Sequence, residues 1–138
     1  MLLCLVVMGI ALCSSSGGAR AQGAPAAVDC VIQTGPCTKT LADGTVTLDI
    51  TPKPVRAMRD LTFTVTFSRV KAAHDPVIDL GMPGMIMGPN RVILKRAGDT
   101  TYQGTGVIVR CPSGRRTWKA TVSVPGTGSA EFVFDVVY

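Results

Sequence analysis

Three methionines gather in one short segment of the chain, and their thioether sulfurs are the first groups that could do chemistry. Met82, Met85 and Met87 lie in the run Met-Pro-Gly-Met-Ile-Met-Gly and make up half of the six methionines in the sequence. Thioether sulfur is a soft ligand that selects Cu(I) and rejects hard cations. In an extended strand Met85 and Met87 share a face, and the Pro83-Gly84 pair lets the backbone kink so that Met82 can turn toward them. We therefore predict a Cu(I) site made of three sulfurs, or of two sulfurs with His74 or a free cysteine.

A second interpretation of the same methionines is purely structural. Methionine fills irregular gaps in hydrophobic cores, and a kinked strand at the rim of a β-sandwich is such a place. Gly81, Gly84 and Gly88 would then serve only the bend. On this alternative the protein is a structural or protein-interaction module that binds no metal, and burial of the Met85 and Met87 side chains would favour it. A surface that docks a partner is a third use for the same segment.

The five cysteines divide between the amino-terminal segment and the rest of the chain. Cys4 and Cys13 lie early, and Cys30, Cys37 and Cys111 follow. At least two of these three should pair in an oxidising compartment. A Cys30–Cys37 bridge closes about 8 residues and a bridge to Cys111 about 75–80, which in the chain-entropy model gives about 2–3 kcal/mol against about 4. We therefore expect a bridge from Cys30 or Cys37 to Cys111, with the third cysteine a free thiol, a link to a partner or a metal ligand.

Catalytic residues are scarce in this sequence. His74 is the only histidine and precedes Asp75-Pro76 in an expected turn, and no serine sits in a G-x-S-x-G motif. An activated nucleophile or an acid–base pair cannot be assembled, so we predict that the protein is not an enzyme. The net charge is +5, but the basic residues are not interleaved with aromatic ones. We therefore expect no nucleic-acid partner.

The amino-terminal segment has the pattern of an export signal. Residues 2–12 form an unbroken apolar run, too short to span a bilayer, and the small residues of Ala19-Arg20-Ala21 suit a signal peptidase. We predict a signal peptide over residues 1–21, cleavage near Ala21, and a periplasmic or secreted protein. The alternative is a lipoprotein signal ending at Cys13, in which case acyl chains would tether the protein to a membrane.

Composition and periodicity predict the fold. The chain of 138 residues is 46% apolar and 17% charged, with 15 glycines and 9 prolines. This balance excludes a disordered chain, a polytopic membrane protein and a helical bundle. Apolar and polar residues alternate in most of seven short segments, which indicates half-buried strands. The segments are 45–50, 61–67, 77–80 running into 81–88, 91–96, 101–109, 117–124 and 130–138.

Seven such strands predict an all-β protein, an immunoglobulin-like two-sheet β-sandwich. We expect three parts: the signal peptide over residues 1–21, an extended leader with two cysteines over residues 22–44, and the sandwich domain over residues 45–138. The methionine segment would continue the third strand of this sandwich.

A family resemblance adds to this interpretation. The stretch from Asp79 to Gly88, with the segments Tyr102-Gln103-Gly104-Thr105-Gly106 and Thr117-Trp118-Lys119-Ala120, resembles the YtkA-like (FixH-related) family of exported domains over residues 45–137. The resemblance implies a small immunoglobulin-like sandwich with a Met-Pro-x-Met-x-Met strand, matched here by Met82, Met85 and Met87. It also implies a role near copper handling or cytochrome oxidase assembly, with a copper-requiring or copper-transporting membrane protein as partner.

The chain departs from that family in two respects. FixH-type proteins are usually tethered by a transmembrane helix, whereas we expect a cleavable signal here. Cys30, Cys37 and Cys111 are not part of the general family pattern. Both departures bear on the oxidase-assembly role more than on the fold.

Overall fold

A computed structural model describes residues 27–138 of the chain. The predicted signal peptide, its cleavage near Ala21 and the alternative of lipidation at Cys13 lie outside the described residues. No helix among the described residues has the length and apolar character needed to cross a bilayer. The described part is built from strands and the loops that join them.

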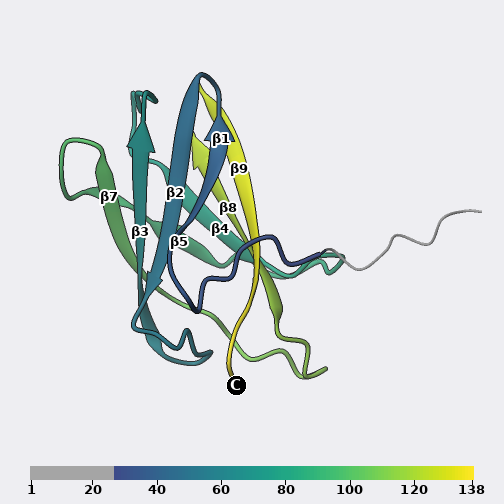
Figure 1. The fold of residues 1–138 in the computed structure, drawn as a ribbon. Coiled ribbons are helices and arrows are strands. Elements are labelled where there is room, and N and C mark those ends of the chain that lie inside the picture. The colour runs from purple at the N-terminus through teal and green to yellow at the C-terminus, as the bar shows by residue number, and fades with distance from the viewer. Residues whose placement is uncertain (1–26) are drawn as a thin grey trace, which may run out of the picture.

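Nine antiparallel strands form two sheets that face each other (Figure 1). The five-stranded sheet has the order β1-β2-β3-β7-β6, and the four-stranded sheet has the order β5-β4-β8-β9. The strands are β1 (Cys37–Leu41), β2 (Gly44–Thr51), β3 (Asp60–Ser68), β4 (Val77–Gly81), β5 (Arg91–Ile93), β6 (Lys95–Arg96), β7 (Thr101–Val107), β8 (Thr117–Val124) and β9 (Gly128–Asp135). The prediction of an all-β, two-sheet sandwich is confirmed, with somewhat more strands than the seven expected.

Alternation of apolar and polar residues explains which face of each sheet points inward. In β2, Val46, Leu48 and Ile50 are fully buried, while the residues between them are partly exposed. The same pattern holds in β3 and β8, whose inward residues include Phe63 and Trp118. Successive side chains of a strand point to opposite faces, so these residues form one core between the two sheets.

One strand expected from the sequence is two strands in the structure. Residues 91–96 alternate, but β5 pairs with β4 and β6 pairs with β7, so the chain crosses from one sheet to the other near the fully buried Leu94. Val92, in β5, and Leu94, at the crossing itself, are both fully buried in the core. The apolar pattern therefore continues through the crossing and does not reveal it.

The amino-terminal part of the sandwich also begins earlier than expected. The predicted leader contains β1, which pairs with β2 at the edge of the five-stranded sheet, and Ile32 before it is fully buried. The backbone N–H groups of Asp29 and Cys30 donate to the Val133 carbonyl of β9, each at 3.0 Å. This segment therefore packs against strands of both sheets and belongs to the sandwich.

The expected long disulfide is wrong. Cys30 bonds to Cys37, with Cα atoms 5.7 Å apart, and Cys111 is buried and bonds to no other cysteine of residues 27–138. The physical reason is position along the sheet. Cys37 pairs with Leu48 in the body of β2, whereas Cys111 lies in the loop that precedes β8. A loop-closure argument compares entropies but does not say which cysteines the fold brings together.

The loops lie at two ends of the sandwich. One end, here called the methionine end, consists of loops 52–59, 82–90 and 108–116 with the carboxy-terminal residues 136–138. Strand pairing places them together, because the start of β3 pairs with the end of β7 and the end of β4 pairs with the start of β8. The opposite end holds the turns at 42–43, 69–76, 97–100 and 125–127.

Candidate metal centre

The methionine segment is a loop that begins with a tight turn, and not the continuation of β4 that the sequence suggested. β4 ends at Gly81, and the N–H of Met85 donates to the carbonyl of Met82 at 3.2 Å. Pro83 has the fixed φ that suits the second position of such a turn, and Gly84 supplies a φ of 72° at the third. These are the features of a type II β-turn. Pro83 also lacks the N–H that a continued ladder would need.

The turn brings two of the three methionines together. The first and fourth residues of a β-turn have Cα atoms within about 7 Å of each other, so Met82 and Met85 are neighbours in space. Met87 follows two residues after Met85 in the same loop. Pro83-Gly84 makes the bend that the sequence predicted, and this bend brings the backbones of Met82 and Met85 close together.

The three methionines differ in their exposure. Met82 is 2% exposed and belongs to the core, Met87 is partly buried and packs against the core, and Met85 is 39% exposed. Ile86, between the last two, is 105% exposed and stands at the tip of the loop. Met85 is therefore the most accessible of the three methionines.

Hydrogen bonds fix both limbs of the methionine loop. The N–H of Leu80 donates to the carbonyl of Asn90 at 2.7 Å, and the Asn90 side-chain amide donates to the Val107 carbonyl at 3.0 Å. The Arg115 guanidinium donates to the carbonyl of Pro83 at 3.0 Å. The loop is thus tied at its base to β4 and β7, and at its turn to loop 108–116.

His74 is not brought to the methionines. It is exposed and precedes β4 by three residues, whereas Met82 follows the last residue of that strand. Five residues of extended strand span about 13 Å from first to last, so the strand separates the two. His74 lies at the opposite end of the sandwich, and the structure does not combine it with the sulfur ligands.

Cys111 lies at the methionine end, in the loop whose Arg115 contacts the methionine turn. Its Sγ is 2.9 Å from the Ser113 hydroxyl oxygen. This hydrogen bond lowers the pKa of the Cys111 thiol, helped by the backbone N–H groups of Ser113 and Arg115 and by the Arg115 charge, and opposed by burial. The thiolate is the form that binds soft metals, so the shift favours ligand chemistry.

One residue at this end carries no sequence signal. Met58 is 63% exposed in loop 52–59 and stands alone in the sequence, away from any motif. With Met82, Met85 and Met87 it completes the four methionines of residues 27–138, and all four lie in loops of the methionine end. Only the fold shows that the four methionines share one end, because loop 52–59 connects β2 to β3 and loop 82–90 connects β4 to β5 of the other sheet.

Other metal-ligand types do not cluster in the part of the chain that the structure describes. Residues 27–138 contain no group of three His, Cys, Asp or Glu side chains placed to hold a metal ion. The candidate soft ligands of this end are therefore the thioethers and the single thiol of Cys111.

The chain matches no family model, no curated protein and no solved structure. The resemblance to the YtkA-like family remains a prediction from the residues that carry it.

Proposed function

We propose that this protein is an exported β-sandwich that binds Cu(I) through Met82, Met85 and Met87 and presents it to a copper-requiring or copper-transporting membrane protein. The observation that carries the proposal is the Met82-Pro83-Gly84-Met85 turn, which brings the backbones of two methionines close together at one end of the sandwich. Thioethers carry no proton to lose and select Cu(I). An oxidising compartment that converts thiols to disulfides leaves such ligands available.

The exposure of Met85 supports ligand binding over packing. A methionine kept only to fill a core gap is expected inside, as Met82 is, yet Met85 and its neighbour Ile86 face solvent. One buried and one exposed thioether on the same turn give a site that is shielded on one side and open on the other. An open side is what transfer to a partner requires.

The packing of two methionines supports a second candidate function, that of a structural or protein-interaction module. Met82 is in the core and Met87 packs against it, as expected for a structural or protein-interaction module. On this alternative both side chains contribute to stability only, and replacing them with leucine changes neither binding nor fold.

Competition with a Cu(I) chelator under anaerobic conditions tests the proposal. The variant Met82→Leu/Met85→Leu/Met87→Leu keeps side-chain volume nearly constant, and such swaps usually cost less than about 1.5 kcal/mol. We expect the wild-type protein to withdraw Cu(I) from the chelator and the triple variant to fail, with an unchanged fold by circular dichroism.

Two matched controls sharpen this titration. Met58→Leu removes an exposed methionine of the same end but outside the turn, and His74→Ala removes the imidazole at the other end. Both should retain the wild-type affinity. Equal affinity in the wild-type protein and the triple variant would assign the methionines to packing.

A further inference from the structure

The loops of the methionine end carry positive charge without any acidic residue. Loops 52–59, 82–90 and 108–116 and residues 136–138 contain six basic side chains and no aspartate or glutamate. Lys53 pairs with Asp49 at 2.7 Å. The other five form no ion pair with a carboxylate within residues 27–138. They are Arg56, Arg59, Arg110, Arg115 and Arg116.

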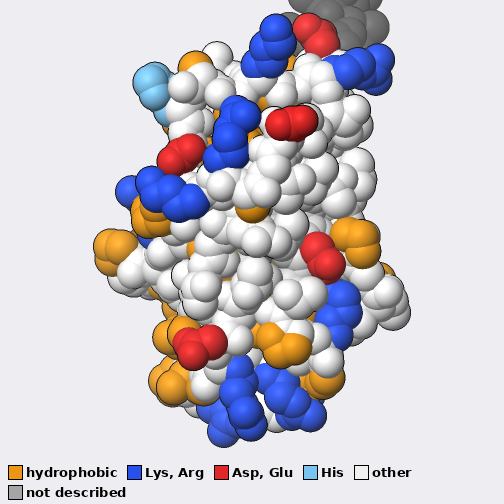
Figure 2. Space-filling model, turned by 90° about the vertical axis from the view of Figure 1, so that its left-hand side faces the viewer, with side chains coloured by type: hydrophobic (Ala, Val, Ile, Leu, Met, Phe, Trp, Pro, Cys, Tyr) orange, Lys and Arg blue, Asp and Glu red, His pale blue; other side chains and the backbone are white. Residues whose placement is uncertain are grey.

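Exposed apolar side chains stand among these arginines. Of the seven large hydrophobic side chains exposed in residues 27–138, four lie in the three loops of this end, and the turns of the opposite end hold none. The four are Met58, Met85, Ile86 and Val109. In Figure 2 a group of Lys and Arg side chains lies at the lower end of the molecule, with hydrophobic side chains and an acidic side chain nearby, while other Lys and Arg side chains lie in the upper half. Exposure of these apolar side chains to water is unfavourable, and an exposed apolar patch often marks an interaction surface.

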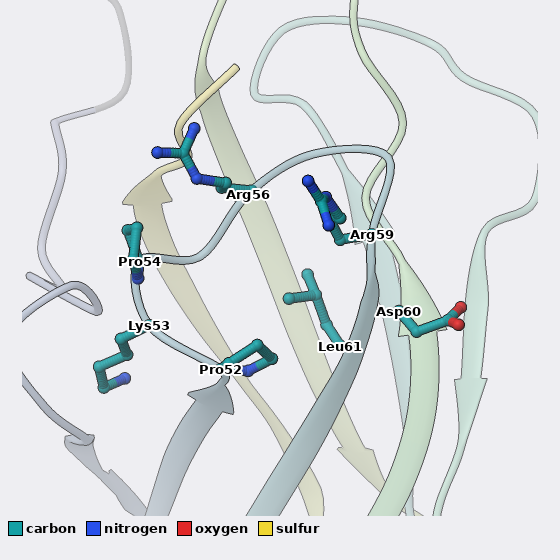
Figure 3. A pocket seen from close by; sticks show the side chains of 7 residues that line it. All are labelled: Pro52, Lys53, Pro54, Arg56, Arg59, Asp60 and Leu61. Carbon is teal, nitrogen blue, oxygen red and sulfur yellow. The ribbon is translucent and has the colours of Figure 1, made fainter.

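A hollow in loop 52–59 adds a place for an anionic group. It measures about 460 Å³ and lies between the two limbs of the loop. Figure 3 shows Leu61 and Pro52 low in this hollow, Arg56 and Arg59 higher along the loop, and the Asp60 carboxylate turned away. Guanidinium groups bind phosphate through paired N–H donors. The hollow therefore suits a phosphate that carries an apolar or glycerol portion.

We propose that the methionine end docks on the surface of a membrane that contains anionic phospholipids. The arginines bind lipid phosphates, and Ile86, Met85, Met58 and Val109 enter the boundary between headgroups and acyl chains. The exposed apolar side chains lie on three separate loops, and a deformable lipid surface can adapt to each of them. An acidic protein partner would need a continuous surface of complementary shape. The inference does not depend on copper. It also places the methionine turn where a membrane partner would receive an ion.

Sedimentation with lipid vesicles tests the electrostatic part. The protein is taken from the periplasm of an expressing bacterium, with its amino terminus established by mass spectrometry so that the apolar run 2–12 is known to be absent. We expect it to bind vesicles that contain phosphatidylglycerol and not vesicles of phosphatidylcholine alone. Salt should weaken the binding, because the Debye length falls from about 10 Å at 0.1 M to about 3 Å at 1 M.

Paired charge variants locate the docking surface. Arg56→Gln/Arg59→Gln removes two charges from the methionine end, and Arg69→Gln/Lys71→Gln removes two from the opposite end. The first should weaken vesicle binding about 25-fold, at about fivefold for each cation near an anionic surface. The second should change it by much less. Equal losses in both pairs would overturn the docking geometry.

Fluorescence of an introduced tryptophan tests insertion. Ile86→Trp should shift to shorter emission wavelength with anionic vesicles and be quenched by brominated acyl chains, over a constant signal from the buried Trp118. Ile93→Trp, at an exposed position on β5, should show neither effect.

Two further results would overturn the proposal. One is an absence of binding to anionic vesicles. The other is binding to soluble polyglutamate as strong as to vesicles, with Ile86→Ser having no effect on either, which would assign the end to an acidic protein partner.

Discussion

Two turns of the same type lie at opposite ends of this sandwich. Met82-Pro83-Gly84-Met85 and Val124-Pro125-Gly126-Thr127 both have proline second, glycine third with φ of 72° and 79°, and a hydrogen bond from the fourth N–H to the first carbonyl. The second turn simply joins β8 to β9. The first turn carries methionine at both of its outer positions. The two turns have the same backbone conformation, so any functional difference between them lies in their first and fourth residues and in the surrounding loops.

The surroundings of the two turns differ in charge as well. The methionine end has six basic and no acidic side chains in its loops, whereas the turns of the opposite end mix both signs. The charged residues there are Asp43, Arg69, Lys71, Asp75 and Asp99, with His74 beside them. The turns of one end thus mix both signs of charge, as an ordinary solvated surface does. The loops of the methionine end carry only basic side chains and exposed apolar ones, with Asp60 next to them at the start of β3. This asymmetry is a second reason, beside the Met82–Met85 turn, to place function at the methionine end.

The largest expected effect separates the two methionines of the first turn. Met82→Ala should lower the free energy of unfolding by about 2–5 kcal/mol, because it opens a cavity at a buried position. Met85→Ala should lower it by less than about 0.5 kcal/mol, because its side chain is at the surface. Urea unfolding of both variants measures the difference. Similar losses in the two would mean that Met85 is also a core residue.

A glycine pair compares the two turns directly. Gly84→Ala and Gly126→Ala each force a side chain into a left-handed backbone conformation, which should cost about 1–2 kcal/mol in both cases. Only Gly84→Ala should weaken Cu(I) binding, because only that turn sets the spacing of Met82 and Met85. Thermal melts and chelator competition provide the two measurements. Copper affinity lost equally in both variants would indicate a global effect of destabilisation.

The smallest effect concerns the thiol beside the methionine turn. Because its pKa is lowered, Cys111 should become thiolate, and reach its plateau rate of alkylation, at a lower pH than a free cysteine. Ser113→Ala removes the main cause of this shift and should move the profile to higher pH. Mass spectrometry of the peptide that contains Cys111 follows the reaction. A profile that does not move in Ser113→Ala would show that its hydroxyl has no influence on the thiol.

The strands whose alternation is regular could be predicted from the sequence. Residues 45–50, 61–67 and 117–124 alternate strictly, and each lies within a strand whose apolar side chains are buried. The edge strand β1 was missed because its sequence, Cys-Thr-Lys-Thr-Leu, presents mostly polar residues to solvent. The crossing at Leu94 could not be seen in the sequence, because the alternation of buried and exposed residues continues from β5 through Leu94 to Lys95.

The candidate site was predictable only in part. Residue types and spacing identified Met82, Met85 and Met87, and Pro83-Gly84 indicated the bend. The positions of His74, Cys111 and Met58 depend on which loops share an end, and that is decided by strand pairing between distant segments. The disulfide likewise depended on distant pairings, since β1 holds Cys37 against β2 and a hydrogen bond holds Cys30 against Val133 of β9.

The most direct test of the proposed copper site observes each methionine separately. In protein labelled with ¹³C at the methionine methyl groups, Ag(I) serves as a diamagnetic substitute for Cu(I). We expect the methyl signals of Met82, Met85 and Met87 to shift together at one equivalent of metal while the signal of Met58 stays in place. Unmoved signals from the turn, or shifts of equal size at Met58, would contradict it.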